Sequence, residues 1–250
     1  MKKIITKNKT VSKKKRTSAK QNKVLILKTV NSKMKAHGGF TWPSKGHVEA
    51  PDWDPKPECG KGLHGALWGE GVGDLFSWAT DAHWIVFEAL ASEVVDLEGK
   101  VKVPRGEVVH VGDQRSATEY LQNHGCKDKV IIGATKVVGH NQVAVVGYDG
   151  TATAGEDGTA TAGNYGTATV GNYGTAMSGH RGTATAGNYG KATAGECGTA
   201  TAGEGGILQI KWYDGKRSRI STGYIGENGL KPNTPYRLND KGEFVKVEVK

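Results

Sequence analysis

The sequence predicts an α+β protein in which a small N-terminal α/β domain precedes a flattened β-solenoid and a C-terminal β cap. The main observation is an eight-residue phrase, Gly-Thr-Ala-Thr-Ala-Gly-x-x, written seven times without a gap in residues 150–205. Short apolar runs and one helical pattern come before this array, and two turn signals come after it. We divide the chain into a disordered basic tail (1–23), the α/β domain (24–133), the solenoid (134–213) and the β-hairpin cap (214–250).

The positive charge of the chain lies in the tail. The formal net charge is +9, and residues 1–23 hold ten Lys/Arg and no Asp/Glu, so the rest of the chain sums to −1. The densest run consists of Lys13, Lys14, Lys15 and Arg16. Such runs are typical of solvated disordered segments, and they also contact phosphates without sequence preference. A solvated tail, nonspecific nucleic-acid contact and an address for transport machinery all stay open as its role.

The sequence predicts a cytoplasmic protein without a membrane segment. No apolar run typical of a signal peptide follows the basic tail, and none reaches the ~20 residues that a transmembrane helix needs. The three cysteines, Cys59, Cys126 and Cys197, are odd in number and widely spaced, so they do not indicate a disulfide framework. We expect reduced thiols and no cofactor.

The α/β domain is predicted from its apolar runs and turn residues. The runs 24–30 and 83–88 are apolar and β-branched enough for buried strands, whereas the Gly-, Pro- and Trp-rich stretch 38–74 predicts irregular loop. The other elements that we expect are a hairpin of 100–103 and 107–111 around Pro104-Arg105-Gly106, a helix over 116–124 that ends at Gly125, and a strand at 130–132 that leads into the solenoid.

The stretch Cys-Gly-Lys-Gly-Leu-His-Gly, residues 59–65, has the strongest chemical character in this domain. Cys59 and His64 would act as nucleophile and base, with nearby acids orienting the imidazole. A metal site would instead recruit His47 or Cys126. In the structural alternative, which we favour, Cys59 packs as a small hydrophobe and His64 bonds a loop carbonyl. No Cys-x-x-Cys, His-Glu-x-x-His or Gly-x-Ser-x-Gly motif supports the chemical interpretations.

The repeat predicts β-strands joined by tight corners. Each phrase has four alternating residues, as in 151–154, and then Gly-x-x-Gly, as in 155–158. Alternation has the period of a strand, and the glycines are expected to supply the positive φ that a corner needs. Two glycines per phrase would destabilise a helix by about 2 kcal/mol relative to Ala. Disorder is the main alternative, but it does not explain the fixed length of the phrase.

Two phrases per coil give flattened 16-residue coils with alanine inside and threonine outside. Flanking octads with Val or Ile in place of Thr extend the array to about ten strands. Strands that begin sixteen residues apart then share a face, and the breaks in Thr-x-Thr, Met177 and Lys191, fall on one face. At a corner, Tyr173 and Tyr189 are placed to stack. The uninterrupted face, here the threonine face, is our candidate binding face: Thr151, Thr153, Thr167, Thr169, Thr183, Thr185, Thr199 and Thr201.

These octads resemble the repeat of bacterial ice-nucleation proteins, which also combines Ala-Gly, aromatic and Thr-x-Thr elements. The resemblance covers residues 134–213 and implies paired octads whose outward Thr-x-Thr ladders organise water. The wider layout of residues 24–250 resembles uncharacterised proteins of bacteria and their phages. Those proteins join a small α/β domain with a Cys-Gly-x-Gly-Leu-His-Gly-like box to a Gly/Ala/Thr/Ser repeat and a short β ending, here 231–238. A phage-encoded chain would lie in the host cytoplasm.

Three functions are compatible with the sequence. The favoured one is a binding or assembly module, a phage or bacterial accessory protein whose rigid solenoid engages an unidentified host macromolecule or a second copy through its edges or faces. The second is a small enzyme that uses Cys59 and His64, so catalysis stays open without being favoured. The third is ice or water ordering by the threonine face. The short array and the lack of an export signal in this sequence argue against the third function.

Overall fold

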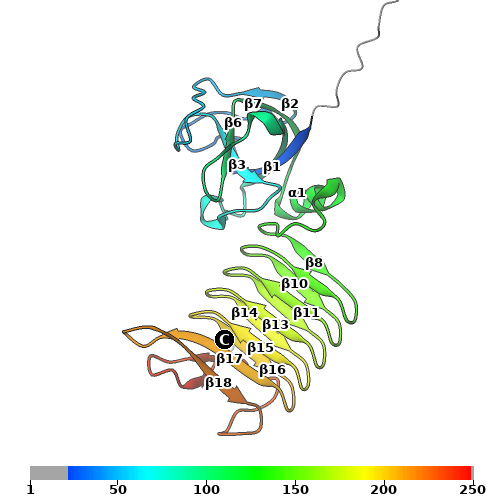
Figure 1. Ribbon diagram of the computed structural model, residues 1–250, viewed down its shortest axis with the longest axis vertical. Helices are drawn as coiled ribbons and strands as arrows, with labels where there is room; N and C mark the ends of the chain where they lie inside the picture. The colour runs from blue at the N-terminus through cyan, green and yellow to red at the C-terminus, as the bar shows by residue number, and fades with distance from the viewer. Residues whose placement is uncertain (1–21, 249–250) are drawn as a thin grey trace, which may run out of the picture.

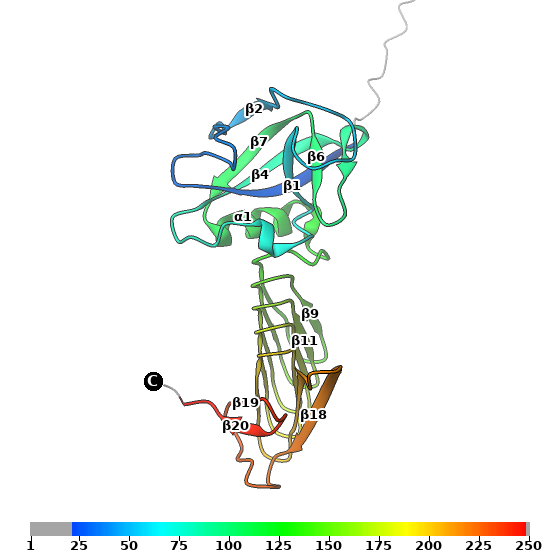
Figure 2. The same cartoon turned by 90° about the vertical axis from the view of Figure 1, so that its left-hand side faces the viewer.

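The computed structural model describes residues 22–248, which form two parts arranged along one long axis (Figures 1 and 2). A β-rich N-terminal unit lies at one end, and stacked coils extend from it to a cap of short strands (Figure 1). The predicted α+β class, with a flattened solenoid of two octads per coil, is confirmed. The basic run from Lys13 to Arg16 lies outside the described residues.

The N-terminal unit is built on a seven-stranded antiparallel sheet with the strand order β2-β7-β4-β1-β3-β6-β5. Along its central pair, side chains alternate between two cores: Leu27 packs on the face toward the helix, and Ile26 packs on the opposite face. The strands are β1 (Lys23–Val30), β2 (Gly46–Glu49), β3 (Leu63–Leu67), β4 (His83–Leu90), β5 (Val95–Asp96), β6 (Val101–Val103) and β7 (Arg105–Gly112), with short 3₁₀ turns η1 (Gly73–Leu75) and η2 (Ala91–Glu93).

The predicted hairpin of 100–103 and 107–111 is wrong. Strand β6 pairs with β3 and β5, whereas β7 pairs with β2 and β4. Only Pro104 separates β6 from β7, which is shorter than the two-residue loop of the tightest common hairpins. Gly106 lies inside β7, where a Cβ would stand 2.6 Å from the carbonyl oxygen of Glu88. This glycine therefore allows a close approach between strands and does not form a turn.

Two further predictions of secondary structure are wrong, because contacts with distant segments determine the conformation of these stretches. The stretch 38–74, predicted as loop, contains β2 and β3, and β3 is held between β1 and β6. The apolar run 130–132 forms no strand. Instead, Ile132 donates its N–H to the carbonyl of Gly69 at 2.9 Å, and Ile131 accepts a hydrogen bond from the N–H of Gly147 at 2.9 Å. These isoleucines fill the junction between the two parts of the molecule.

Helix α1 (Gln114–Leu121) begins two residues before the predicted start at 116. Asp113 sets this start, since its carboxylate accepts a hydrogen bond from the N–H of Ser116 at 2.7 Å. A wider turn, η3 (Gln122–Cys126), follows the helix, and Gly125 ends it with φ +94°. Ala117 and Leu121 are fully buried, so α1 covers the face of the sheet that meets the solenoid.

The array forms ten strands in two parallel sheets, and each 16-residue coil gives one strand to each sheet. Residues that face each other across neighbouring strands are sixteen apart, as Ala152 pairs with Ala168 and Ala168 with Ala184. These alanines are 0% exposed, which confirms an alanine interior. The first sheet holds β8 (Thr135–Val137), β10 (Thr151–Ala154), β12 (Thr167–Val170), β14 (Thr183–Ala186) and β16 (Thr199–Ala202), and the second holds β9 (Val143–Val145), β11 (Thr159–Ala162), β13 (Thr175–Ser178), β15 (Lys191–Ala194) and β17 (Ile207–Tyr213).

The corner glycines do not have the positive φ expected from the sequence. In each Gly-x-x-Gly corner, the residue before the second glycine takes that conformation, as in Asp157 (φ 53°) and Cys197 (φ 58°). The corner closes with a hydrogen bond, 3.2 Å between Gly158 N and Gly155 O in one copy. The first glycine is required by stacking, because a Cβ on Gly155 would lie 2.8 Å from the backbone nitrogen of His140 in the preceding coil.

Both ends of the solenoid are covered. At the N-terminal end, the Tyr148 ring stacks on Trp78 with a centroid distance of 5.3 Å, and its hydroxyl donates to Asp74 Oδ1 at 2.9 Å. At the other end, the cap strands are added to the edges of the two solenoid sheets, so the outward faces of the solenoid sheets stay free. Strand β18 (Ser218–Tyr224) pairs antiparallel with β17, while β19 (Tyr236–Leu238) meets β16 and pairs with β20 (Phe244–Lys246). The parallel stack of coils therefore ends in antiparallel strands, with β18 and β20 as the new edges of the two sheets.

Candidate functional site

The threonine face is the outward surface of the first solenoid sheet. Its threonines stand in register from coil to coil, with Thr151, Thr167, Thr183 and Thr199 in one row. The second row consists of the partners two residues further along each strand. Thr151 is exposed and the other seven are half-buried. Among the described residues, no side-chain hydrogen bond occupies these hydroxyls, so they are available to solvent.

This face is a two-dimensional array because the sheet itself is regular. Neighbouring strands of a sheet lie about 4.8 Å apart, and alternate residues of one strand lie about 6.6 Å apart. Identical β-branched side chains at every coil repeat these spacings for the methyl and hydroxyl groups. Threonine has few χ1 rotamers on a strand, so little conformational freedom is lost when its surroundings become ordered.

The outward side of the second sheet lacks this regularity, and we call it the interrupted face. In β13, Met177 takes the place of the second threonine of the Thr-x-Thr pattern, and in β15, Lys191 takes the place of the first. In the last strand the outward residues are Ile207 and Gln209. The Thr193 hydroxyl donates a hydrogen bond to Gln209 Oε1 at 3.5 Å, so one hydroxyl of the interrupted face is bound to another side chain of the protein. The same solenoid therefore carries a regular threonine face and an irregular face, and the effects of substitutions on the two can be compared.

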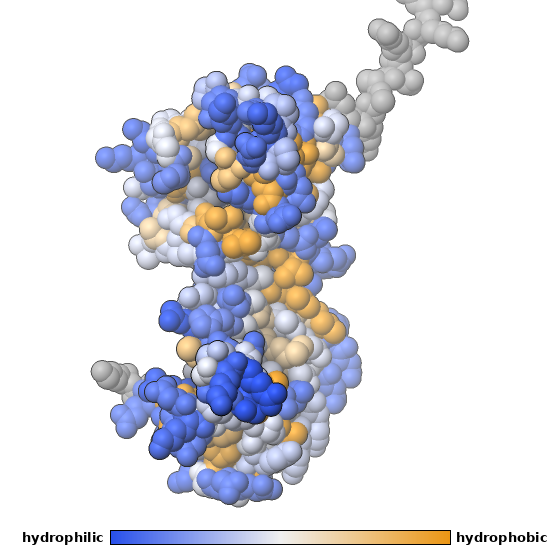
Figure 3. Space-filling view, turned by 60° about the vertical axis from the view of Figure 1, so that its left-hand side comes forward, coloured by the Kyte–Doolittle hydropathy of each residue, from blue (hydrophilic) through white to orange (hydrophobic). Residues whose placement is uncertain are grey.

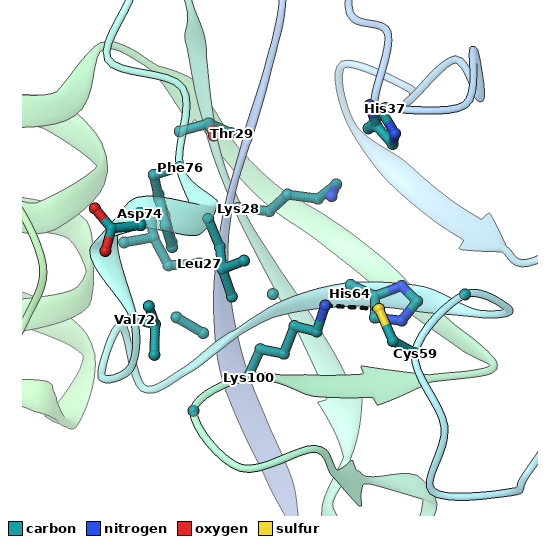
Figure 4. A pocket seen from close by; sticks show the side chains of 15 residues that line it. Leu27, Lys28, Thr29, His37, Cys59, His64, Val72, Asp74, Phe76 and Lys100 are labelled. Atoms are coloured by element: carbon teal, nitrogen blue, oxygen red, sulfur yellow. Dashed lines mark hydrogen bonds between the residues drawn. The ribbon is translucent and has the colours of Figure 1, made fainter.

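Cys59 and His64 come together at a cavity of about 480 Å³ in the N-terminal unit (Figure 4). His64 Nδ1 donates to the carbonyl of Gly62 at 3.0 Å, which leaves Nε2 as the unprotonated ring nitrogen. Nε2 is buried and has no hydrogen-bond partner among the described residues. Cys59 Sγ accepts a hydrogen bond from Lys100 Nζ at 2.8 Å. No hydrogen bond joins Cys59 to His64 in the described part of the chain, so the expected nucleophile and base are neighbours without a direct link.

Sequence reasoning missed the two lysines of this cavity, Lys28 and Lys100. Burial, with a smaller effect from the charge of Lys100, lowers the pKa of Lys28 to about 8. Burial also lowers the pKa of His64, and the charges of Lys100 and Lys28 lower it further. The signal in the sequence is Lys28, a lysine that directly follows the apolar run Val24–Leu27. A metal site with His47 or Cys126 has no support, because no group of three or more ligating side chains occurs among residues 22–248.

Hydrophobic side chains also gather where the N-terminal unit meets the first coils (Figure 3). Val72 and Leu75, at the cavity, are 43% and 55% exposed. Val137 and Val143 in the first coil are 71% and 58% exposed. The solenoid therefore becomes more apolar toward the N-terminal unit, where valine replaces the threonine of the repeat.

Comparisons with known proteins give one match for the N-terminal unit and another kind of match to octad-repeat proteins. Residues 24–123 match the model of a domain of unknown function, DUF7666. Over 107 residues, 42% of this chain, the sequence is 42% identical to the ice nucleation protein InaU of Pantoea ananas, of which the match covers 10%. An ice nucleation protein of Pseudomonas syringae is 42% identical over 102 residues, 40% of this chain and 9% of the relative. The chain thus spans about a tenth of the length of these curated relatives. No solved structure matches the chain.

These comparisons correct the location expected from the sequence. The cytoplasmic prediction is wrong, because the ice nucleation proteins that the chain matches are outer-membrane-anchored surface proteins. Within residues 22–248, no helix has the length and apolar character needed to cross a membrane. The chain therefore joins a region that matches the model of a domain of unknown function, DUF7666, to an octad β-solenoid that resembles the repeat of bacterial ice-nucleation proteins.

Proposed function

We propose that the threonine face orders water and binds the surface of ice. The observation that carries this proposal is the register of the eight threonines, whose spacing repeats identically across four neighbouring strands. The alanine interior supports it, because small side chains allow the two sheets to pack closely and hold the strands rigidly. The names of the matched relatives, which are ice nucleation proteins, are consistent with this role.

Rigid spacing matters because ordering water costs entropy. Each water that is immobilised costs up to about 2 kcal/mol. A fixed lattice of hydroxyls and methyl groups positions many waters together and adds little cost for ordering protein side chains. Since this chain spans only about a tenth of its relatives, we expect a weaker effect than a full-length ice nucleation protein would give.

The test uses the two faces of the solenoid as matched surfaces. Thr167→Lys with Thr183→Lys disrupts neighbouring strands of the threonine face, and Thr159→Lys with Thr175→Lys makes the same change on the interrupted face. We expect the parent chain to show thermal hysteresis and a raised droplet-freezing temperature. The first pair should abolish both effects and the second should preserve them. Equal behaviour of the two variants, at equal folded content by circular dichroism, would refute a specific role of the threonine face.

A second candidate function is a binding or assembly module, favoured by one corner of the solenoid. Tyr173 and Tyr189 stack in parallel with centroids 5.5 Å apart and an interplanar angle of 9°. They are 62% and 60% exposed, so the stacked pair presents apolar ring surface to solvent. A stacked, rigid aromatic pair offers a large apolar contact at low entropic cost.

This candidate predicts self-association through the tyrosine corner. Sedimentation velocity should show a concentration-dependent dimer for the parent chain and a monomer for Tyr173→Asn with Tyr189→Asn. Asparagine suits this test because it tolerates the positive φ of 59° and 56° at these positions. A parent chain that stays monomeric at high concentration would argue against assembly through this corner.

A further inference from the structure

The cavity of the N-terminal unit is a separate site, because no residue of the solenoid lines it. Its volume of about 480 Å³ falls in the range of ~300–1,000 Å³ that is usual for pockets that take small molecules. The wall is divided into a cationic part and an apolar part (Figure 4). The proposed role of the threonine face uses neither part.

The cationic part consists of Lys28 on β1 and Lys100 just before β6. Figure 4 shows both side chains directed to the side of the cavity where His64 lies. Neither lysine forms an ion pair among residues 22–248: Lys28 Nζ lies 5.5 Å from the centroid of the Trp42 ring, and Lys100 Nζ contacts Cys59 Sγ. Two like charges held close together without an acid are unfavourable, and a bound anion would relieve this repulsion.

The acid in the lining does not neutralise these lysines. Asp74 points to the opposite side of the cavity in Figure 4, and its Oδ1 accepts the hydrogen bond from the Tyr148 hydroxyl at 2.9 Å. The other titratable groups of the lining are His37, His64 and Cys59. The lowered pKa of His64 makes it neutral at pH 7, so it does not add a charge there. The lysine end of the cavity is therefore positive without an internal counter-charge.

The apolar part of the wall consists of Leu27, Val72, Leu75 and Phe76. Val72 and Leu75 are partly exposed, so they form an apolar rim at solvent. A ligand that filled the cavity would cover this rim and gain about 25 cal/mol for each Å² of apolar surface removed from water.

We propose that this cavity binds a small organic anion, a carboxylate on an apolar body, with its carboxylate between Lys28 and Lys100. The carboxylate accepts hydrogen bonds from the two ammonium groups, and the apolar body packs against Val72, Leu75 and Phe76. Charge-assisted hydrogen bonds of this kind are stronger than neutral ones, and they set the direction in which the ligand enters. The neutral amide of the same shape lacks the charge and binds more weakly.

Binding of an anion is linked to the protonation of Lys28. In the free protein the pKa of Lys28 is about 8, so the amine is mostly protonated at pH 7 and mostly neutral at pH 9.5. A bound carboxylate stabilises the protonated form and raises this pKa. Affinity for the anion is therefore expected to fall several-fold between pH 7 and pH 9.5.

The experiment is isothermal titration calorimetry of the full chain with benzoate and hexanoate, and with benzamide and hexanamide as neutral isosteres. Lys28→Met and Lys100→Met remove one charge each and keep the apolar stem. Lys61→Met is the control, because Lys61 lies in the same loop as Cys59 and pairs with Asp54 at 3.8 Å outside the cavity lining. Circular dichroism and thermal melts verify that each variant is folded.

We expect at least one carboxylate to bind about tenfold or more tightly than its amide, a difference of about 1.4 kcal/mol. Each cavity variant should weaken that binding about tenfold, Lys61→Met should leave it unchanged, and the loss of affinity at pH 9.5 should disappear in Lys28→Met. Three results would overturn the proposal. These are equal binding of acid and amide, an equal effect of Lys61→Met, or no heat from either carboxylate up to about 10 mM.

Discussion

Substitutions in a single solenoid corner distinguish two reasons for its glycines: close contact between stacked coils, and a backbone conformation with positive φ. A Cβ added to Gly195 would lie 2.5 Å from the carbonyl carbon of Gly179 and 2.7 Å from the nitrogen of His180. These are backbone atoms of the neighbouring coil, so no side-chain rotation relieves the contact. Two residues later, Cys197 holds the positive φ of 58° that glycine would adopt freely. If glycine serves stacking, then Gly195→Ala should be harmful and Cys197→Gly should be tolerated.

The magnitudes follow from these contacts. Overpacking a site that cannot relax costs about 1–3 kcal/mol, and the Gly195 N–H also bonds the carbonyls of Ser178 and Gly179 at 3.0 and 3.2 Å, which holds the coils together. For Cys197→Gly, relief of about 1–2 kcal/mol of left-handed strain exceeds the 0.5–1 kcal/mol entropic cost of glycine. We therefore expect Gly195→Ala to lower the free energy of unfolding by about 1–3 kcal/mol. Cys197→Gly should raise it by up to about 1 kcal/mol.

Urea unfolding followed by circular dichroism measures both changes, and thermal melts provide a second reading. In a chain of this size, each kcal/mol corresponds to roughly 2–4 °C in Tm. Gly195→Ala should shift the midpoint to lower urea without changing the slope. The stacking argument would be refuted if Gly195→Ala left stability unchanged while Cys197→Gly lowered it.

Two further predictions concern titratable groups of the N-terminal unit. The folded pKa of Lys28, about 8, is below its ordinary value of 10.5, so its burial destabilises the fold below pH 8 and this penalty disappears as pH rises through 10.5. Lys28→Met should raise the free energy of unfolding by about 3 kcal/mol at pH 7 and by little at pH 11, as measured by urea unfolding. Asp113→Ala removes the cap of α1 and should cost about 1 kcal/mol at pH 7. Because the Ser116 N–H lowers the pKa of Asp113, this cost should decrease as pH falls through that lowered value in pH-dependent melts, since a neutral carboxyl accepts the hydrogen bond more weakly.

The solenoid was predictable because its local pattern and its global fold agree. Strict alternation defines each strand. Because each coil holds two octads, residues sixteen apart pair with each other, and this register follows from the repeat alone. The role of the glycines was less accessible, since glycine suits both a positive φ and a close contact. In the folded solenoid, Asp157 and Cys197 take the positive φ instead.

The N-terminal unit was less predictable because distant segments decide its pairing. The Pro104-Arg105-Gly106 sequence has the composition of a turn, yet Gly106 is used for the contact with β4. The same limit applies to the cavity. Cys59 and His64 lie only five residues apart in the sequence, whereas Lys28 and Lys100 become neighbours only when β1, β3 and β6 pair.

The two-face construction of the solenoid makes a prediction about deletions. Removal of 167–182 takes out one full coil and joins Gly166 to Thr183, so every later strand stays in its own sheet. Such an array should fold with lower stability, since coils interact mainly with their neighbours. Removal of 167–174 takes out one octad and moves every later strand to the opposite sheet.

The octad deletion would carry Met177 onto the threonine face and place β17, which β18 caps, at the end of the wrong sheet. We expect a cooperative thermal transition for the coil deletion, and a broadened transition with exposed apolar surface for the shorter one. Binding of the dye 1-anilinonaphthalene-8-sulfonate reports that surface. If the smaller deletion unfolded as cooperatively as the larger one and bound no more dye, the assignment of alternate octads to two sheets with dedicated caps would be untenable.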